Sequence, residues 1–158
     1  MLDTNIFDLM LKNNIDLSIL PKDVSFYITH IQHDEIRKCS NEKLRHKLLD
    51  FFLTLKKECV PIASMIAGVS RAGQCRVGSG ELYKKLCNGN ARNTHDALIA
   101  ETCFFENLIL ITEDKKLRSS MRRFGGEALS YQNFLNSMML NVSMKNLNCS
   151  TSDERQGL

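Results

Sequence analysis

Apolar residues in the first sixty positions recur at helical spacing, apart from one run of aromatic and β-branched residues. Ile6, Leu9 and Met10 share one face of a predicted helix, which Thr4 or Asn5 can cap. The predicted elements are a helix through about residue 12, a strand over 23–29, and a hairpin of two helices over about 31–39 and 41–58.

The second half shows the same alternation more strongly. Residues 95–106 are apolar on nearly every side, which predicts a buried helix capped by Thr94. Around it we expect helices over 81–87, 115–123 and 131–140, a strand over 108–112 and a short strand near 128–130. Helices that alternate with strands predict an α/β fold: a central, mostly parallel, twisted sheet of about four to five strands, with helices on both faces and the hairpin inserted.

The stretch of residues 60–80 breaks this pattern. Four glycines are spread through it, together with Arg71 and Arg76, and they predict a loop around one or two short helical turns. It is either a flexible basic loop that contacts phosphates or an ordinary long connection. We therefore expect one domain over residues 1–140, followed by a polar, loosely ordered tail over 141–158.

Composition narrows the class of protein. With 43% hydrophobic and 25% charged residues in 158 positions, the chain resembles a soluble globular protein. Its longest aliphatic run, residues 108–111, is far shorter than the ~20 residues that span a membrane. Asp3 stands where a secretory signal would carry a base, and the six cysteines lack the spacing of zinc or redox motifs. These features favour a cytoplasmic protein with reduced thiols and no membrane contact.

Charge is segregated along the chain. Residues 1–35 have a net charge of −4, residues 36–95 of +8 and residues 96–158 of −1. An acidic pocket beside a basic surface would suit a polyanion bound around a cation, although Lys and Arg on solvated helix faces give the same numbers.

Four acids occupy places where sites form. Asp3 and Asp114 follow strands, Glu35 lies on the helix after the second strand, and Asp96 lies in the first turn of the buried helix. The carboxyl edge of an open α/β sheet is the usual position of a site. Taken singly, each acid has another explanation, as a helix cap, a partner of the helix dipole or a solvated side chain.

Four short segments surround these acids. They are Leu2-Asp3-Thr4-Asn5-Ile6, residues 29–36 with Thr29 six positions before Glu35, Asp96-Ala97-Leu98-Ile99-Ala100, and Leu110-Ile111-Thr112-Glu113-Asp114. In order and spacing, over roughly residues 1–135, they resemble the four motifs of PIN domains, especially VapC-type toxins. The chain departs from that family in having only two residues before Asp3, so that the first strand is short or the chain begins upstream.

The resemblance implies metal-dependent hydrolysis of RNA phosphodiester bonds, by the toxin of a toxin–antitoxin pair. Asp3, Asp96 and Asp114 would bind Mg²⁺ or Mn²⁺ directly or through water, and Glu35 would hold a second ion or its water. Asn5 and Thr112 would orient these ligands. The implied partners are RNA, a cognate antitoxin protein and a second copy of the chain; Arg71 and Arg76 are candidate RNA contacts.

Three alternatives stay open. A PIN-like scaffold could bind RNA or a protein without cutting. His30, His33 and Glu35 form an H-x-x-H-x-E pattern that could be a metal site, although no third imidazole is placed to complete it. A phosphatase of the haloacid-dehalogenase type would need an acid at position 5, where this chain has Asn. Asp34 and Glu113 adjoin site acids, and we place them outside the site because successive side chains rarely converge.

Overall fold

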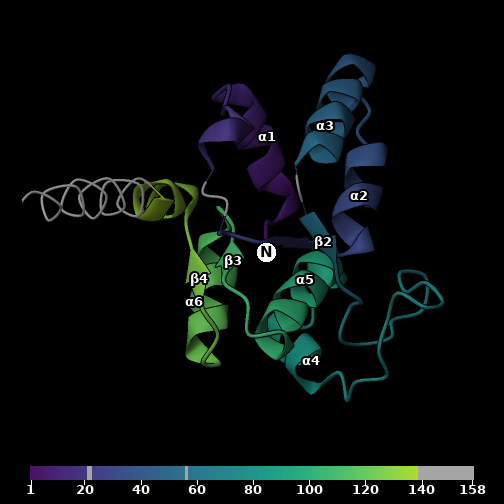
Figure 1. The fold of residues 1–158 in the computed structure, drawn as a ribbon. Helices are drawn as coiled ribbons and strands as arrows, with labels where there is room; N and C mark the ends of the chain where they lie inside the picture. Colours follow the sequence, from purple (N-terminus) through teal and green to yellow (C-terminus); the bar gives the residue numbers. More distant parts are fainter. Residues whose placement is uncertain (21–22, 56, 139–158) are drawn as a thin grey trace, which may run out of the picture.

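The computed structural model describes residues 1–20, 23–55 and 57–138, which form a mixed α/β fold (Figure 1). Within these residues, four short strands form two small parallel sheets. Strand β1 (Phe26–Ile28) pairs with β2 (Lys57–Cys59), and β3 (Leu110–Ile111) pairs with β4 (Ala128–Leu129). The expectation of parallel strands is confirmed, but they are shorter than predicted and are not assembled into one regular sheet.

The first three residues connect the two sheets. The Leu2 amide donates to the Tyr27 carbonyl of β1 at 3.4 Å, and the Asp3 amide donates to the Ile111 carbonyl of β3 at 2.9 Å. The Ile111 amide in turn donates to the Met1 carbonyl at 2.9 Å, so that this segment runs parallel to β3. Asp3 therefore follows extended backbone that hydrogen-bonds on both sides.

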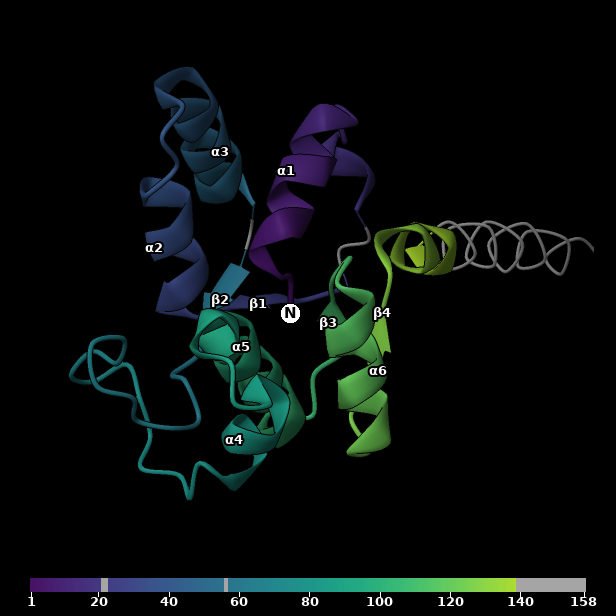
Figure 2. The same cartoon turned by 180° about the vertical axis from the view of Figure 1, so that it is seen from behind.

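Helices cover the strands from two sides, as Figures 1 and 2 show. On one side are α1 (Thr4–Lys12), α2 (His30–Arg37) and α3 (Glu42–Thr54); on the other are α4 (Glu81–Cys87), α5 (Thr94–Phe105) and α6 (Lys115–Arg123). Two short 3-10 helices, Leu17–Ile19 and Ala91–Asn93, and a helix that includes residues 131–138 complete the described elements. This arrangement gives two buried apolar clusters, one containing Phe7 and Phe52 and the other containing Leu98 and Met121.

The central helix α5 is buried along most of its length. Every residue from Ala97 to Cys103 is buried, as expected for a helix that is apolar on nearly all sides. Its first turn, with His95 and Asp96, is half-buried and lies at the end of the helix where the site acids gather.

Helix caps differ in detail from the sequence expectation. Asp3, rather than Thr4 or Asn5, caps α1 by accepting from the Thr4 amide at 2.7 Å. Thr94 is the first residue of α5, not its cap. Asp114 caps α6, as one of the interpretations of that acid anticipated.

Other differences have local causes. Helices α4 and α6 occupy the predicted ranges, whereas the helix predicted over 41–58 ends at Thr54. Residues 57–59 are instead strand β2, whose backbone groups pair with β1. The apolar spacing continues through Leu55, which is buried, and so it could not mark the end of the helix.

The loop of residues 60–80 contains no regular helix, but the Ser70 amide donates to the Ile66 carbonyl at 2.9 Å and closes a single helical turn, as predicted. Two backbone hydrogen bonds join its two sides, from the Ile62 amide to the Gln74 carbonyl at 3.0 Å and from the Arg76 amide to the Ile62 carbonyl at 2.8 Å. Other contacts attach it to the rest of the fold, such as the hydrogen bond from the Ala63 amide to the Thr102 hydroxyl at 3.2 Å. A Cβ at Gly78 would lie 2.5 Å from the Ala63 carbonyl oxygen, so the backbone approaches too closely there for any other residue.

No helix in the described part of the chain has the length and apolar character needed to cross a bilayer. The end of the helix predicted over 131–140 and the polar tail predicted over 141–158 lie outside the described residues.

Candidate functional site

Asp3 is the most deeply placed of the four acids, with an exposed fraction of 3%. Its Oδ2 accepts from the Thr112 hydroxyl at 2.5 Å and from the Asn5 amide nitrogen at 2.7 Å. Burial raises the pKa of the Asp3 carboxyl above its ordinary value, and the hydrogen bonds from Thr112, Thr4 and Asn5 partly offset this effect. The carboxylate is thus fixed in position by its neighbours.

Thr112 connects Asp3 to Asp114. This threonine follows β3 directly and is fully buried. Its hydroxyl donates to Asp3 and accepts from the Asp114 amide at 3.1 Å. Asp114 then caps α6, because its Oδ1 accepts from the Lys116 and Leu117 amides at 2.7 and 3.0 Å. Capping occupies one oxygen of Asp114 and leaves the other available.

Glu35 reaches the same place from α2. Its Oε2 accepts a short hydrogen bond from the Thr4 hydroxyl, and its Oε1 lies 2.7 Å from Nδ1 of His95. Because a carboxylate oxygen only accepts, Nδ1 of His95 carries the hydrogen. Glu35 is therefore held between α1 and α5 and is not a solvated side chain.

Asp96 differs from the other three acids. Its carboxylate makes no hydrogen bond to any other described residue, although the side chain is half-buried. Burial raises its pKa to about 7, with further increases from the charges of the other three acids, which His95 partly offsets; those acids are Asp3, Glu35 and Asp114. Asp96 therefore lies close enough to each of the other three carboxylates to be repelled by it.

The cluster has no strong counter-charge of its own. Among the described residues, no Lys or Arg forms an ion pair with any of the four carboxylates, and His95 pairs with Glu35 alone. Within the described ranges, no group of three or more His, Cys, Asp or Glu side chains is arranged so that it could hold a metal ion as it stands. Oxygen donors without a cationic partner nevertheless fit a hard divalent ion, which prefers carboxylates and water.

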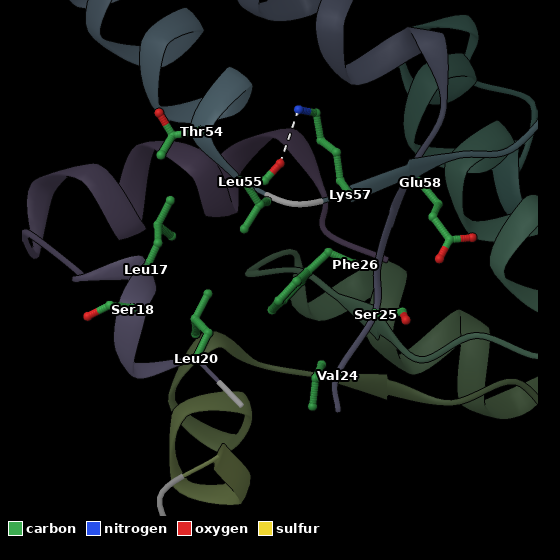
Figure 3. Close-up of a pocket in the computed structure, with 10 residues that line it drawn as sticks. All are labelled: Leu17, Ser18, Leu20, Val24, Ser25, Phe26, Thr54, Leu55, Lys57 and Glu58. Carbon is green, nitrogen blue, oxygen red and sulfur yellow. Dashed lines mark hydrogen bonds between the residues drawn. The ribbon is translucent and has the colours of Figure 1, made fainter. Parts of the chain in front are cut away.

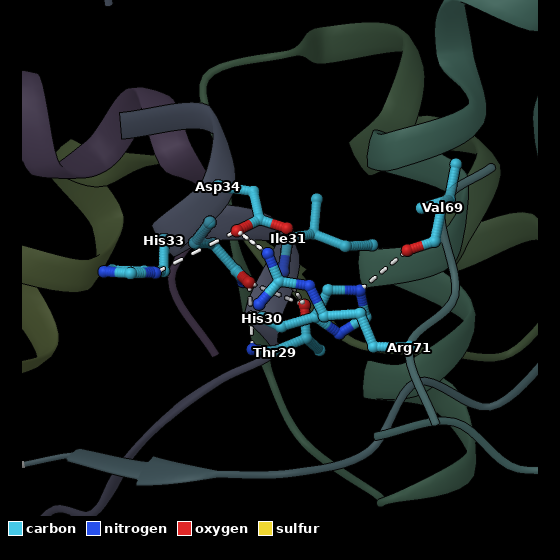
Figure 4. Close-up of polar contacts among 8 residues, drawn as sticks. Thr29, His30, Ile31, His33, Asp34, Val69 and Arg71 are labelled. Carbon is cyan, nitrogen blue, oxygen red and sulfur yellow. Dashed lines mark hydrogen bonds and ion pairs between the residues drawn. The ribbon is translucent and has the colours of Figure 1, made fainter. Parts of the chain in front are cut away.

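The structure thus gathers six of the eight residues selected from the sequence, and it places the other two elsewhere. Arg71 pairs with Asp34 at 2.6 Å (Figure 4), and Arg76 pairs with Glu106 at 2.5 Å. Glu113, which we placed outside the site, accepts from the Tyr131 amide at 2.7 Å.

The two histidines of the H-x-x-H-x-E pattern have different neighbours. His30 is buried, and its Nε2 lies 3.0 Å from the Val69 carbonyl oxygen (Figure 4). His33 lies against the ring of Phe52, with a centroid separation of 5.6 Å. Glu35 binds Thr4 and His95 instead, so the pattern does not form a common site.

Sequence analysis missed the two groups that hold Glu35. In the sequence, Thr4 is only a possible helix cap, and His95 is only the first residue of the buried helix predicted over 95–106. The signal available was their adjacency to Asp3 and Asp96, because a residue next to a site acid lies at the same edge of the fold.

A pocket of about 560 Å³ lies apart from these carboxylates (Figure 3). It is bounded by the 3-10 helix Leu17–Ile19, the approach to β1 and the end of α3, and apolar side chains such as Leu20, Val24 and Leu55 line it. Lys57 closes one side, where its ammonium donates to the Leu55 carbonyl at 3.3 Å. None of the four acids lines this pocket.

In comparisons with known proteins, no family model matches the chain and no curated protein is significantly similar to it.

Proposed function

We propose that the chain is a PIN-type ribonuclease that hydrolyses RNA phosphodiester bonds with Mg²⁺ or Mn²⁺. The observation that carries this proposal is the group of four carboxylates, in which burial, and after it the charges of the other three acids, raises the pKa of Asp96 to about 7. Structural acids are usually paired or solvated, whereas a perturbed carboxyl group among like charges is typical of a functional site.

The positions of the acids support this proposal. Parallel strands with helices on both sides, linked through residues 1–3, are the arrangement expected of a PIN-like domain. Asp3 follows the extended segment that contains Leu2, and Asp114 comes shortly after Ile111 of β3. These two segments pair in parallel, so their carboxyl ends meet at one edge of the fold.

Asp3, Asp96 and Asp114 would hold the cation, and Glu35 would hold a second ion or a water molecule. When bound, the cation supplies an activated water and stabilises the leaving oxygen of the phosphodiester. Thr112 and Asn5 keep the Asp3 carboxylate in one orientation through hydrogen bonds to Oδ2. Asp96, whose carboxylate hydrogen-bonds to no other described residue, has a pKa raised to about 7, chiefly by burial, and a bound cation would favour its charged form.

Two parts of the proposal rest on the sequence resemblance alone. These are the assignment as the toxin of a toxin–antitoxin pair and the partners that follow from it, a cognate antitoxin and a second copy of the chain. The nuclease proposal does not depend on either partner, so it can be tested on the isolated protein.

The test compares wild type with Asp96→Asn on single-stranded RNA in Mg²⁺, in Mn²⁺ and in EDTA. We expect cleavage by wild type only with metal, and a loss of about a hundredfold or more in Asp96→Asn, since about 2.7 kcal/mol of barrier corresponds to that factor. Asp50→Asn, an exposed acid on α3, serves as the matched control and should cleave like wild type.

Sequencing the RNA fragments from the same reactions would identify the target. Cleavage that persists in EDTA, or in folded Asp96→Asn, would contradict the proposal. RNA binding by wild type without any cleavage would favour the alternative of a binding module.

A further inference from the structure

A basic hollow lies on the side of the fold that carries α4 and α6. It encloses about 420 Å³. Its lining is entirely polar or cationic and consists of Lys85, Asn88, Lys115, Lys116, Arg123 and the serines at 119 and 120. We call this feature the α4–α6 hollow.

The cations of the α4–α6 hollow are free of acidic partners. All four are exposed, and none forms an ion pair with another described residue. Two other bases of α6 are occupied differently, because Arg118 donates to the Thr112 carbonyl and Arg122 donates to the Ala128 carbonyl at 2.7 Å. Helix α6 thus has two bases that bind backbone carbonyls and three others that are exposed; of these three, Arg123 also has its guanidinium 4.8 Å from the centroid of the Phe124 ring.

Helix stability does not account for two of these lysines. Lys115 and Lys116 are the first residues of α6, and that end of a helix carries partial positive charge. Acids are favoured there and cations are disfavoured, so the Asp114 cap contributes to stability while the lysines oppose it. A pair of lysines at this end of the helix is explained more readily by a ligand than by folding.

The α4–α6 hollow begins where the carboxylate cluster ends. Lys115 follows Asp114 directly, and the Lys116 amide donates to the Asp114 carboxylate at 2.7 Å. The hollow also contains Asn88, which caps the C-terminal end of α4 and precedes Thr94, the first residue of α5, by six positions. The first turn of α5 carries Asp96. Two of the four acids are therefore connected to this hollow by short stretches of chain.

We infer that the α4–α6 hollow binds the phosphate groups of an RNA strand on one flank of the bond that is cut. This inference rests on the proposed nuclease function and specifies where the substrate lies. Lysine and arginine neutralise phosphates, while serine hydroxyls and an asparagine amide can donate to phosphate oxygens. Because these contacts are made to the RNA phosphate backbone and not to the bases, the α4–α6 hollow would increase the affinity for RNA of any base sequence.

The experiment measures binding separately from cleavage. All variants are made in the Asp96→Asn background, and the probe is a fluorescently labelled single-stranded RNA of about 20 nucleotides in EDTA, titrated at several salt concentrations. The test variant is Lys115→Gln with Lys116→Gln. The matched control is Lys43→Gln with Lys47→Gln, which removes two exposed lysines from α3.

Each phosphate contact on a single strand contributes about 0.7 to the slope of log affinity against log salt. We therefore expect the test variant to lose about 1.4 from that slope and to bind at least about tenfold more weakly at low salt, while the control keeps the parent slope. An unchanged slope in the test variant, or no measurable RNA binding by the parent, would overturn the inference.

Two further measurements distinguish a failure of the RNA-binding inference from a failure of the nuclease proposal. Cleavage by the otherwise wild-type chain, combined with an unchanged slope, would refute the α4–α6 hollow and leave the nuclease proposal standing. The expected slope change without cleavage would retain the RNA site and refute the nuclease. Poly-glutamate is added as a competitor, and displacement as effective as that by unlabelled RNA of equal charge would mark a general anion surface and contradict an RNA site.

Discussion

The four carboxylates of the candidate site and the arginines of the loop over residues 60–80 have opposite environments. Four acids gather at one edge with only His95 to offset their charge. Each arginine of the loop instead has its own acid, Asp34 for Arg71 and Glu106 for Arg76. Both regions looked functional in the sequence, but only one keeps unneutralised charge in the folded protein.

The difference teaches how to weigh charged residues in a fold of this kind. Like charges brought together destabilise the folded protein and need a compensating cation or proton. Paired charges on the surface contribute little in either direction. A cluster that lowers stability is thus a stronger indication of function than a loop whose charges are already satisfied. The predictions below test this contrast, from the largest expected effect to the smallest.

The largest expected effect is the stabilisation of the folded protein by a metal ion bound at the four carboxylates. A ligand at a hundredfold excess over its dissociation constant stabilises the folded state by about 2.7 kcal/mol, which is roughly 5–10 °C in Tm for a chain of this size. We expect wild type to gain about this much in Mg²⁺ or Mn²⁺, and Asp114→Asn to gain much less. In EDTA, Asp114→Asn should unfold at the higher temperature, because one like charge is removed while Asn still caps α6.

Thermal unfolding in EDTA and in metal provides the measurement. Asp16→Asn is the control, since Asp16 also caps a short helix but does not belong to the cluster. An equal response to metal in wild type and Asp114→Asn would show that Asp114 is not a ligand.

The pKa of Asp96 predicts the next largest effect, a loss of stability as pH rises in EDTA. Its folded value of about 7 exceeds the ordinary value of 3.8, so between these values the folded state binds a proton that the unfolded state has released. Stability therefore falls as pH increases through this window and levels off above about 7. The raised pKa of Asp3 acts in the same direction.

Three pKa units correspond to about 4 kcal/mol, and partial solvation of Asp96 reduces the expected loss to on the order of 2 kcal/mol. Urea unfolding at several pH values between 5 and 8 measures it. Asp96→Asn should show a flatter profile than wild type. A wild-type stability that rises over the same range would contradict the assignment of charge repulsion.

The sequence predicted some elements of the fold correctly and missed others. The ranges of α4 and α6 follow from apolar spacing with clear end signals, and the structure confirms both. Strand β2 was missed because two of its three residues are charged and because pairing with β1 is a contact between distant segments. Spacing along the chain does not encode such pairing.

The neighbouring positions of Asp3 and Asp114 were predictable because strand ends share an edge, a rule that needs no knowledge of side-chain contacts. The contact of His95 with Glu35 was not predictable, since it joins α2 and α5 across sixty positions. The acidic partners of Arg71 and Arg76 were also not predictable, because the conformation of a loop depends on its turns and on the surface against which it packs.

A smaller effect should come from His95, which we expect to position Glu35. His95→Leu removes the donor to Oε1 and should lower cleavage about tenfold, as loss of a group that orients a metal ligand typically does. Asn places its amide nitrogen at the same number of bonds from Cα as Nδ1 of histidine, so His95→Asn should restore most activity. His95→Gln, whose amide lies one bond further away, should not.

Steady-state cleavage of the three His95 variants separates kcat from KM, and thermal unfolding reports whether each is folded. A purely structural role would lower the unfolding temperature in parallel with activity and would not single out His95→Asn. Equal activity in His95→Leu and wild type would show that His95 does not position Glu35 for cleavage.

The smallest effects are expected at the loop arginines. Arg71 and Arg76 have exposed side-chain fractions of 49% and 53%, and ion pairs of this kind contribute about 0–1 kcal/mol. Arg71→Gln with Arg76→Gln should therefore change the free energy of unfolding by less than about 1 kcal/mol. Because Asp34 and Glu106 already neutralise these arginines, the salt dependence of RNA binding should change less than in Lys115→Gln with Lys116→Gln. If the loop pair instead reduced the slope by as much as the lysine pair, the arginines would leave their acids to bind RNA, and the contrast between the two regions would fail.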